Sequence, residues 1–269
     1  MSTDPHQETA SHDDHFVRSL ERGLAVIRVF TPHTPKMTLS EVARAAGLTR
    51  AAARRFLLTL VDLGYVRTDG RGFALTPRVL ELGYAYLSSA SLPELSQPHL
   101  ERLAAEVRES SSISVLDGDD VVYVARVPTS RIMTVAINVG TRFPAYATSM
   151  GRVLLTGKSE DQLTEYLERV QLHRLTARTL ATPARLRAEV ERVRSQGWAI
   201  VDQELEQGLR SVAVPIRDRS GTVVAAANVS AHASRAPAED LRRELLPPLL
   251  ATAARIEADL EITTRSAGG

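Results

Sequence analysis

Residues 39–66 read LSEVARAAGLTRAAARRFLLTLVDLGYV, and this stretch decides the fold of the first part of the chain. It holds two helical patterns separated by Gly47, which permits a tight turn. We expect Ser40 to cap the first helix and Thr49 the second, because a hydroxyl oxygen accepts a hydrogen bond from the free N–H groups at a helix start. The stretch therefore predicts a helix, a tight turn and a second helix that runs to about Leu63.

The second helix has two distinct faces. Its apolar residues, from Phe56 to Leu63, recur at helical spacing and define the inward face. Arg50 and Arg54 are four residues apart and therefore share another face, while three consecutive alanines from Ala51 keep this end of the helix narrow. An α-helix fits the major groove of DNA, and arginines in its N-terminal half can reach base edges. The second helix is thus a candidate recognition helix.

Residues 64–75, GYVRTDGRGFAL, predict a hairpin that turns at Asp69-Gly70. A helix-turn-helix followed by such a hairpin is the winged form of the motif, and arginines near the hairpin tip can meet phosphates or the minor groove. The predicted DNA-binding residues are Thr49, Arg50, Ala51, Arg54, Arg55, Arg67 and Arg71.

Basic side chains are concentrated in this part of the chain. Residues 16–80 contain eleven Lys and Arg against four Asp and Glu, whereas the net charge of the whole chain is +1. A basic block of one-domain size favours nucleic-acid binding by that block. Two structural alternatives stay open: the helices can form a plain helical corner, and the basic face can be solvated without a partner.

Length and composition exclude several classes of protein. The 269 residues favour two domains, and the apolar and charged fractions of 43% and 24% are ordinary for a globular protein. The chain has no cysteine, which excludes disulfide scaffolds, thiolate metal sites and cysteine nucleophiles. The N-terminus is polar and acidic, and no run of about 18 apolar residues occurs, so we expect a cytoplasmic protein without a membrane span.

The remainder of the chain predicts an antiparallel sheet with helices packed against it. Strand-like segments include residues 112–116 and 120–127, and a strong helix begins at Pro183 and ends before Gly197. The predicted fold class is α+β. The predicted order is a disordered tail over 1–15, a winged helix-turn-helix domain over 16–78, a linker helix over 79–92, an α/β domain over 93–263 and a disordered tail over 264–269.

From Val17 to about Leu260 the chain resembles the IclR family of bacterial transcriptional regulators. Four segments carry the resemblance in the family's order: SLERGLAVIRVF at 19–30, the stretch at 39–66, FPAYATSMGRVLL at 143–155 and GWAIVDQELEQGLRSVAVPIRDRSGTVVAAANVS at 197–230. In particular it resembles the branch that regulates catabolism of aromatic acids, such as protocatechuate and 4-hydroxybenzoate, through the β-ketoadipate pathway. The resemblance implies a GAF-like effector-binding domain over 93–263, an operator in double-stranded DNA, and a dimer or dimer of dimers.

An aromatic acid effector is an anion with an apolar ring. Its pocket needs a cation or a helix N-terminus, apolar walls and a few hydroxyl-capable side chains. Within the resemblance, the helix that starts in ATSMG, residues 147–151, presents free N–H groups to the effector carboxylate. The predicted effector-binding residues are Arg126, Arg142, Tyr146, Thr148, Ser149, Met150, Gly151, Asp202, Leu209, Ser211, Ala213, Asn228 and Ser230.

ATSMG also differs by one residue from the G-x-S-x-G elbow of serine hydrolases, with Ala147 in place of the first glycine. A hydrolase that uses Ser149, with Asp202 and His232 as partners, is one alternative function. A small-molecule sensor that does not bind DNA is another. The strand-helix alternation of a hydrolase fold is absent around the elbow, and no phosphate loop, metal-ligand motif or other cofactor signature occurs. We therefore expect a regulator that needs no cofactor and catalyses no reaction.

Overall fold

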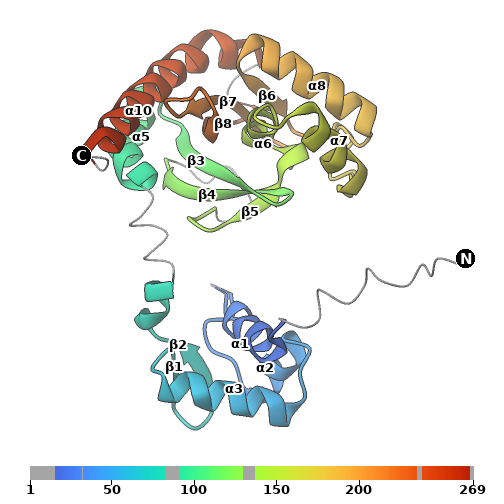
Figure 1. Cartoon of the computed structure of the whole chain (residues 1–269), viewed down its shortest axis with the longest axis vertical. Coiled ribbons are helices and arrows are strands. Elements are labelled where there is room, and N and C mark those ends of the chain that lie inside the picture. Colours follow the sequence, from blue (N-terminus) through green and yellow to red (C-terminus); the bar gives the residue numbers. More distant parts are fainter. Residues whose placement is uncertain (1–15, 32, 83–90, 130–136, 235–237, 267–269) are drawn as a thin grey trace, which may run out of the picture. The chain divides into compact units, whose positions relative to one another are not determined.

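The computed structural model describes residues 16–31, 33–82, 91–129, 137–234 and 238–266. The chain divides into two compact units, Met1–Ser89 and Ala90–Gly269 (Figure 1). The predicted N-terminal tail and residues 83–90 of the predicted linker helix lie outside the described residues.

The first unit is a winged helix-turn-helix. Val26, Val42 and Leu57 are fully buried in its core. Gly47 makes the predicted tight turn with a φ of +64°, a conformation that costs a glycine little. Leu63 departs from the expected inward face and is 51% exposed, because it follows the last residue of the second helix. The elements are α1 (Arg18–Arg28), α2 (Leu39–Ala45), α3 (Arg50–Asp62), β1 (Val66–Thr68), β2 (Phe73–Leu75) and the 3-10 turn η1 (Pro77–Leu80).

Hydroxyl side chains cap both helices of the motif. Thr49 caps α3 as predicted, since its Oγ1 accepts from the Ala52 N–H at 3.2 Å. At α2 the structure corrects the prediction, because Thr38 rather than Ser40 is the cap. The Thr38 N–H donates to the Glu41 carboxylate at 2.7 Å, and the Glu41 N–H donates back to Thr38 Oγ1. This reciprocal capping box satisfies two free N–H groups and starts the helix before Ser40.

The second unit is built on an antiparallel sheet, which among the described residues has six strands in the order β5-β4-β3-β8-β7-β6. The strands are β3 (Ser110–Asp117), β4 (Asp120–Val127), β5 (Arg142–Pro144), β6 (Ala199–Asp202), β7 (Leu209–Arg217) and β8 (Val223–His232). The helices are α5 (Ser91–Val107), η2 (Ala145–Ala147), α6 (Ser149–Leu155), α7 (Glu160–Arg169), α8 (Pro183–Gln196), α9 (Ala238–Asp240), a π-helical turn (Leu241–Leu245) and α10 (Leu246–Ser266). This arrangement confirms the predicted α+β class, although α10 extends three residues into the predicted C-terminal tail.

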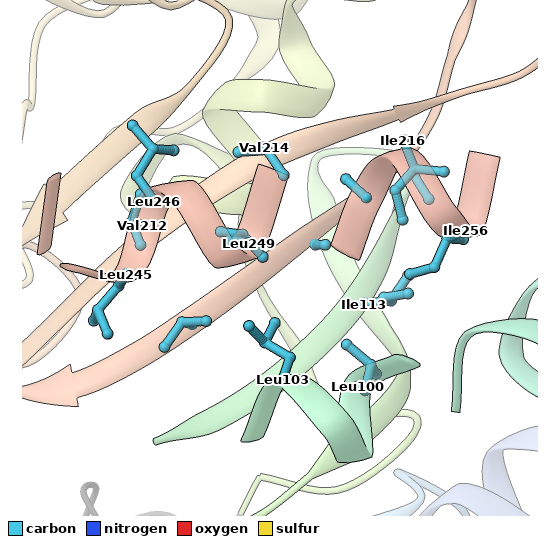
Figure 2. Packing of buried hydrophobic residues seen from close by; sticks show 14 of the residues in the cluster. Leu100, Leu103, Ile113, Val212, Val214, Ile216, Leu245, Leu246, Leu249 and Ile256 are labelled. Carbon is cyan, nitrogen blue, oxygen red and sulfur yellow. The ribbon is translucent and has the colours of Figure 1, made fainter. Parts of the chain in front are cut away.

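Each face of the sheet buries its own apolar cluster. α5 and α10 cover one face, where Leu103 and Leu249 pack with Val214 (Figure 2). α6, α7 and α8 form the layer on the opposite face, around Leu155 and Leu163. Because side chains alternate between the two faces along a strand, only every second residue meets α6. The layer under α6 contains the buried polar side chains of Ser149, Arg152 and Ser211.

Candidate functional site

α3 presents the predicted DNA-contacting side chains on its exposed surface. Thr49, Arg50, Ala51, Arg54 and Arg55 are all exposed, while the opposite side of the helix is anchored in the core. Arg50 and Arg54 are one helical turn apart, so their side chains extend from neighbouring positions. The N-terminal half of α3 thus offers three guanidinium groups and one small methyl side chain.

The hairpin β1–β2 carries Arg67 and Arg71, both exposed. Asp69 holds the turn, because its carboxylate accepts from the backbone N–H groups of Arg71 at 3.1 Å and Gly72 at 3.0 Å, and from Lys36 Nζ at 2.5 Å. The Lys36 bond is the largest cause that lowers the pKa of Asp69 to about 2, followed by the two backbone bonds. The hairpin tip is therefore tied to the segment before α2.

The five arginines of this surface carry uncompensated charge. No guanidinium group of Arg50, Arg54, Arg55, Arg67 or Arg71 has a hydrogen-bond or ion-pair partner within the part of the chain that the structure describes. Exposed cations on a helix and a hairpin are the groups that bind the phosphate backbone and reach base edges. The first unit therefore has the surface that its sequence predicts for DNA.

The second unit encloses a cavity between the sheet and the start of α6. Its lining comes from four strands, the segment before β5, the end of η2, the N-terminus of α6 and the loop after β6: Tyr123, Ile137, Ala147, Thr148, Ser149, Met150, Val201, Leu205, Leu209, Ser211, Asn228 and Ser230. About 10 Å³ is open to the centre of a water molecule, which is room for one water. The cavity is therefore narrower than an aromatic ring requires.

Polar atoms gather where the sheet meets the start of α6. Ser149 Oγ and Ser211 Oγ share a hydrogen bond of 2.8 Å, and Asn228 Nδ2 donates to Ser230 Oγ at 2.9 Å. Asn228 Oδ1 is buried and has no partner among the described residues. A buried amide oxygen without a partner is costly, so it is a ready acceptor for a ligand hydroxyl. Burial raises the pKa of Tyr123 to about 12, which keeps this hydroxyl protonated at neutral pH.

A β-bulge turns Arg126 toward the same face. In the register with β3, Val124 of β4 has no partner, so Val124 and Ala125 both pack on the α5 and α10 side. The next residue, Arg126, therefore returns to the side of Tyr123. Without the bulge, two residues three positions apart would face opposite sides.

Arg126 is a half-buried cation beside the cavity. Its Nη1 donates to Ser112 Oγ at 3.0 Å, and Ser112 is the register partner of Asn228. Its Nε is buried, and no described residue accepts from it. Burial lowers the pKa of Arg126, but a guanidinium remains charged near neutral pH. Arg126 does not itself line the cavity, and Ser112, on the strand between theirs, separates it from Asn228.

Arg142 and Tyr146 lie away from the cavity. Arg142 forms surface ion pairs with Asp117 at 2.6 Å and Asp120 at 3.2 Å, and the Asp117 bond is the largest cause that raises its pKa. Tyr146 is buried, and its hydroxyl donates to the His173 carbonyl at 3.1 Å. Neither side chain is in position to bind a ligand in the cavity.

Three further predicted residues have structural contacts instead. A Cβ on Gly151 would lie 2.1 Å from the Ala145 carbonyl oxygen, so the glycine permits the close approach of α6. Ala213 packs in the apolar cluster of the α6 layer. Partial burial raises the pKa of Asp202, but the hydrogen bonds from Arg210 and Gln203 and the charges of Arg210 and Arg178 together outweigh burial and leave the pKa below its usual value. These residues shape the wall without lining the cavity.

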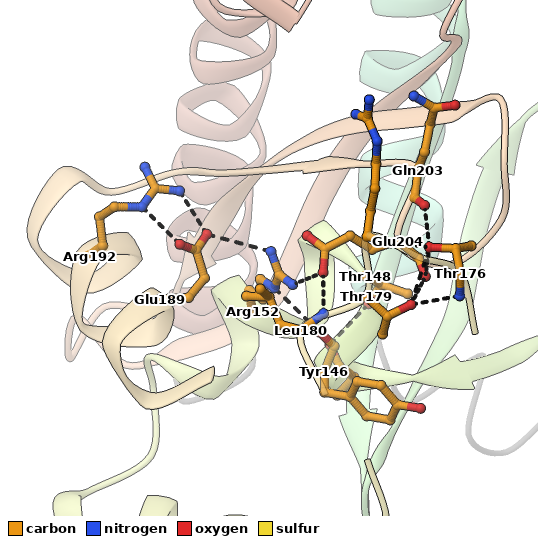
Figure 3. Close-up of polar contacts among 12 residues, drawn as sticks. Tyr146, Thr148, Arg152, Thr176, Thr179, Leu180, Glu189, Arg192, Gln203 and Glu204 are labelled. Carbon is orange, nitrogen blue, oxygen red and sulfur yellow. Dashed lines mark hydrogen bonds and ion pairs between the residues drawn. The ribbon is translucent and has the colours of Figure 1, made fainter. Parts of the chain in front are cut away.

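A buried ion-pair cluster lies behind α6 (Figure 3). Arg152 has an exposed fraction of 1%, and its Nη2 donates to Glu204 Oε2 at 2.5 Å. Its Nη1 lies 3.6 Å from Glu189 Oε1, and its Nε donates to the Tyr146 carbonyl at 3.3 Å. Glu204 Oε2 also accepts from the Leu180 N–H at 3.0 Å. One guanidinium thus connects α6 with α8 and with the loop after β6.

Sequence reasoning missed much of the apolar wall, namely Tyr123, Ile137, Ala147, Val201 and Leu205, together with Arg152 behind it. Alternation along β4 could have marked Tyr123 as facing one side. It would not have found Leu205, because Gln203 has a φ of +60° and ends the strand pattern. Although Asp202 and Glu204 are two residues apart, the positive φ of Gln203 between them interrupts the strand alternation that would place them on one face.

Ser149, His232 and Asp202 are not arranged as the catalytic triad that a serine hydrolase needs. Its hydroxyl is bonded to Ser211, the Nδ1 of His232 is bonded to Ser234, and Asp202 is paired with Arg210. Among the described residues, no group of three or more His, Asp or Glu side chains is arranged to hold a metal ion.

The chain matches two family descriptions over nearly all of its described length. Residues 19–70 match the IclR helix-turn-helix domain, and residues 84–258 match the bacterial transcriptional regulator IclR C-terminal domain. The chain belongs to the IclR family. It is therefore a DNA-binding transcriptional regulator and not an enzyme. In the described part of this IclR-family regulator, no helix combines the length and apolar character that crossing a bilayer demands.

Proteins similar to this regulator include one relative in sequence and two of solved structure. It is 48% identical to the Pca regulon regulatory protein of Pseudomonas putida, over 89% of this chain and 82% of the relative. A solved transcriptional regulator from Rhodococcus sp. RHA1 is 61% identical, with a TM-score of 0.82 over 91% of this chain and 98% of that one. An IclR homologue from Microbacterium hydrocarbonoxydans, solved in complex with 4-hydroxybenzoate, is 26% identical, with a TM-score of 0.80 over 90% and 98% of the two chains.

Proposed function

We propose that this regulator controls genes of aromatic compound catabolism and responds to an aromatic carboxylate such as 4-hydroxybenzoate or protocatechuate. The similarity to a Pca regulon regulator and to a homologue that binds 4-hydroxybenzoate supports this effector class. A regulator of genes acts where the chromosome lies, so we place it in the cytoplasm.

The chemistry of the cavity carries the proposal. Met150, Leu205 and Leu209 supply apolar contacts for a ring. The unpaired Arg126 Nε suits a carboxylate, and the unpaired Asn228 Oδ1 suits a ring hydroxyl. Since the closed cavity holds about one water, the effector requires one wall to move before it binds.

DNA binding is assigned to the basic surface of the first unit. We assign base contacts to Arg50 and Arg54 on α3, and phosphate or minor-groove contacts to Arg67 and Arg71 on the hairpin. A single winged module reads a short site, so a homodimer or a dimer of dimers would present several modules to repeated half-sites. Val17 and Leu20, 58% and 62% exposed at the start of α1, give an apolar surface for a second copy of the chain.

Isothermal titration with 4-hydroxybenzoate tests the effector assignment. We expect binding by the wild type and a loss of about tenfold or more for Arg126→Ala, since a hydrogen bond to a charged group contributes ~1.5–3 kcal/mol. Arg142→Ala is the matched control, because it removes the same charge from a surface ion pair. Equal losses in both variants would show that the carboxylate partner is misplaced. No binding of either 4-hydroxybenzoate or protocatechuate would reject the effector class.

A further inference from the structure

The 203–209 loop, which here means the connection between β6 and β7 together with the first residue of β7, forms one wall of the cavity through Leu205 and Leu209. It closes on itself, because the Gln203 N–H donates to the Leu209 carbonyl at 2.7 Å and the Gly208 N–H donates to Gln203 Oε1 at 3.1 Å. Gln203 and Gly208 both have positive φ, at +60° and +83°. For a glutamine this conformation is strained and persists only where neighbouring contacts hold it.

Several contacts hold the loop. Thr176 Oγ1 donates to the Gln203 carbonyl at 2.7 Å, and the Ala233 N–H donates to the Gly208 carbonyl at 2.7 Å. The buried Arg152 adds a cation. The Arg152 guanidinium binds the Glu204 carboxylate at the start of the loop, while Thr179 Oγ1 donates to the Glu204 carbonyl at 2.7 Å. Arg152 itself belongs to α6, one helical turn after Ser149, whose hydroxyl lines the opposite wall. A single buried cation therefore ties the two walls of the cavity together (Figure 3).

We propose that Arg152 is a positioning residue whose ion pair with Glu204 latches the 203–209 loop over the effector cavity. The cavity is too small for an aromatic acid as it stands, so the effector enters only when a wall withdraws. The loop is the wall with two turn positions of positive φ, whereas α6 is buried along its whole length. The strength of the latch then sets how fast effector enters and leaves. This inference rests on the proposed effector site.

Hydrogen–deuterium exchange of the full chain, without any effector, tests the latch directly. Glu204→Gln keeps the size of the side chain and removes its charge. We expect the amides of residues 203–209 to exchange at least about fivefold faster in this variant, with β3 and β8 unchanged, because only local opening is affected. Arg192→Ala is the control, since Arg192 pairs with Glu189 at 2.7 Å but does not contact Glu204. Unchanged exchange in the loop would overturn the latch, and so would faster exchange throughout the second unit.

Stopped-flow binding of 4-hydroxybenzoate gives the second measurement. In Glu204→Gln we expect association and dissociation rates both to rise by about fivefold or more, whereas Arg152→Lys, which keeps the charge, should have rates closer to those of the wild type. Wild-type rates in Glu204→Gln would show that the loop is not the entrance. If the wild type binds neither 4-hydroxybenzoate nor protocatechuate, the effector assignment fails, while the exchange measurement still decides whether Arg152 holds the loop.

Discussion

The two units of this regulator use arginine in opposite ways. On the first unit, the guanidinium groups of Arg50, Arg54 and their neighbours are exposed and unpaired within the described part of the chain. In the second unit, Arg152 is buried between two carboxylates, and Arg126 is half-buried with an unpaired Nε. An exposed arginine attracts a polyanion such as DNA, and this attraction is screened by salt. A buried arginine either holds the packing through ion pairs or, where a donor is unpaired, can bind one small anion. The residue type is the same in each case, so burial and ion pairing decide whether an arginine attracts DNA, binds a small anion or holds the packing.

The largest effect should come from the buried arginine. Arg152→Ala leaves Glu204 without its cation, so we expect the free energy of unfolding of the second unit to fall by ~3–5 kcal/mol. Urea unfolding followed by the fluorescence of Trp198, the single tryptophan, measures this loss. Arg142→Ala removes a surface pair and should cost less than about 1 kcal/mol. Similar values for the two variants would remove the distinction between buried and exposed arginine.

The exposed arginines should affect DNA and leave stability alone. Arg50→Ala or Arg54→Ala should weaken operator binding by ~1–3 kcal/mol and relax preference at one base pair, if each side chain reads a base edge. Arg185→Ala, which removes the same charge from an exposed position on α8, is the control in a gel-shift titration. A double Arg50/Arg54 alanine variant that keeps both its circular dichroism spectrum and wild-type affinity would reject α3 as the recognition helix.

The smallest effect should come from the carboxylate that holds the hairpin. The pKa of Asp69 is lowered from an ordinary 3.8 to about 2, so its stabilising effect is present above pH 3.8 and is lost as the pH falls through about 2. An NMR titration of the Asp69 carboxyl should give a midpoint near 2 in the wild type and nearer 3.8 in Lys36→Gln. A wild-type midpoint close to 3.8 would show that the hairpin tip is not held by this carboxylate.

The sequence predicted the first unit better than the cavity for a physical reason. Helical spacing, Thr49 and Asp69-Gly70 are local signals, and even the correct cap of α2 was readable as the Thr38–Glu41 capping box. In the sequence, Arg126 and Arg142 both look like arginines of a strand. A β-bulge turns Arg126 toward the face of the sheet that carries the cavity, whereas Asp117 and Asp120 pair with Arg142 at the surface. Strand register and ion pairs between separate strands produce no periodic pattern in the sequence, so the sequence did not predict the roles of these two arginines.

We infer that a ligand in the cavity of the second unit alters DNA binding by the first. Fluorescence anisotropy of labelled operator DNA, titrated with the full chain with and without 4-hydroxybenzoate, tests it most directly. We expect the effector to change the dissociation constant for DNA by about 5- to 150-fold in the wild type, the usual range of allosteric coupling. In Arg126→Ala we expect no such change, with unaltered affinity in the absence of effector. An identical dissociation constant with and without saturating effector in the wild type would contradict the claim.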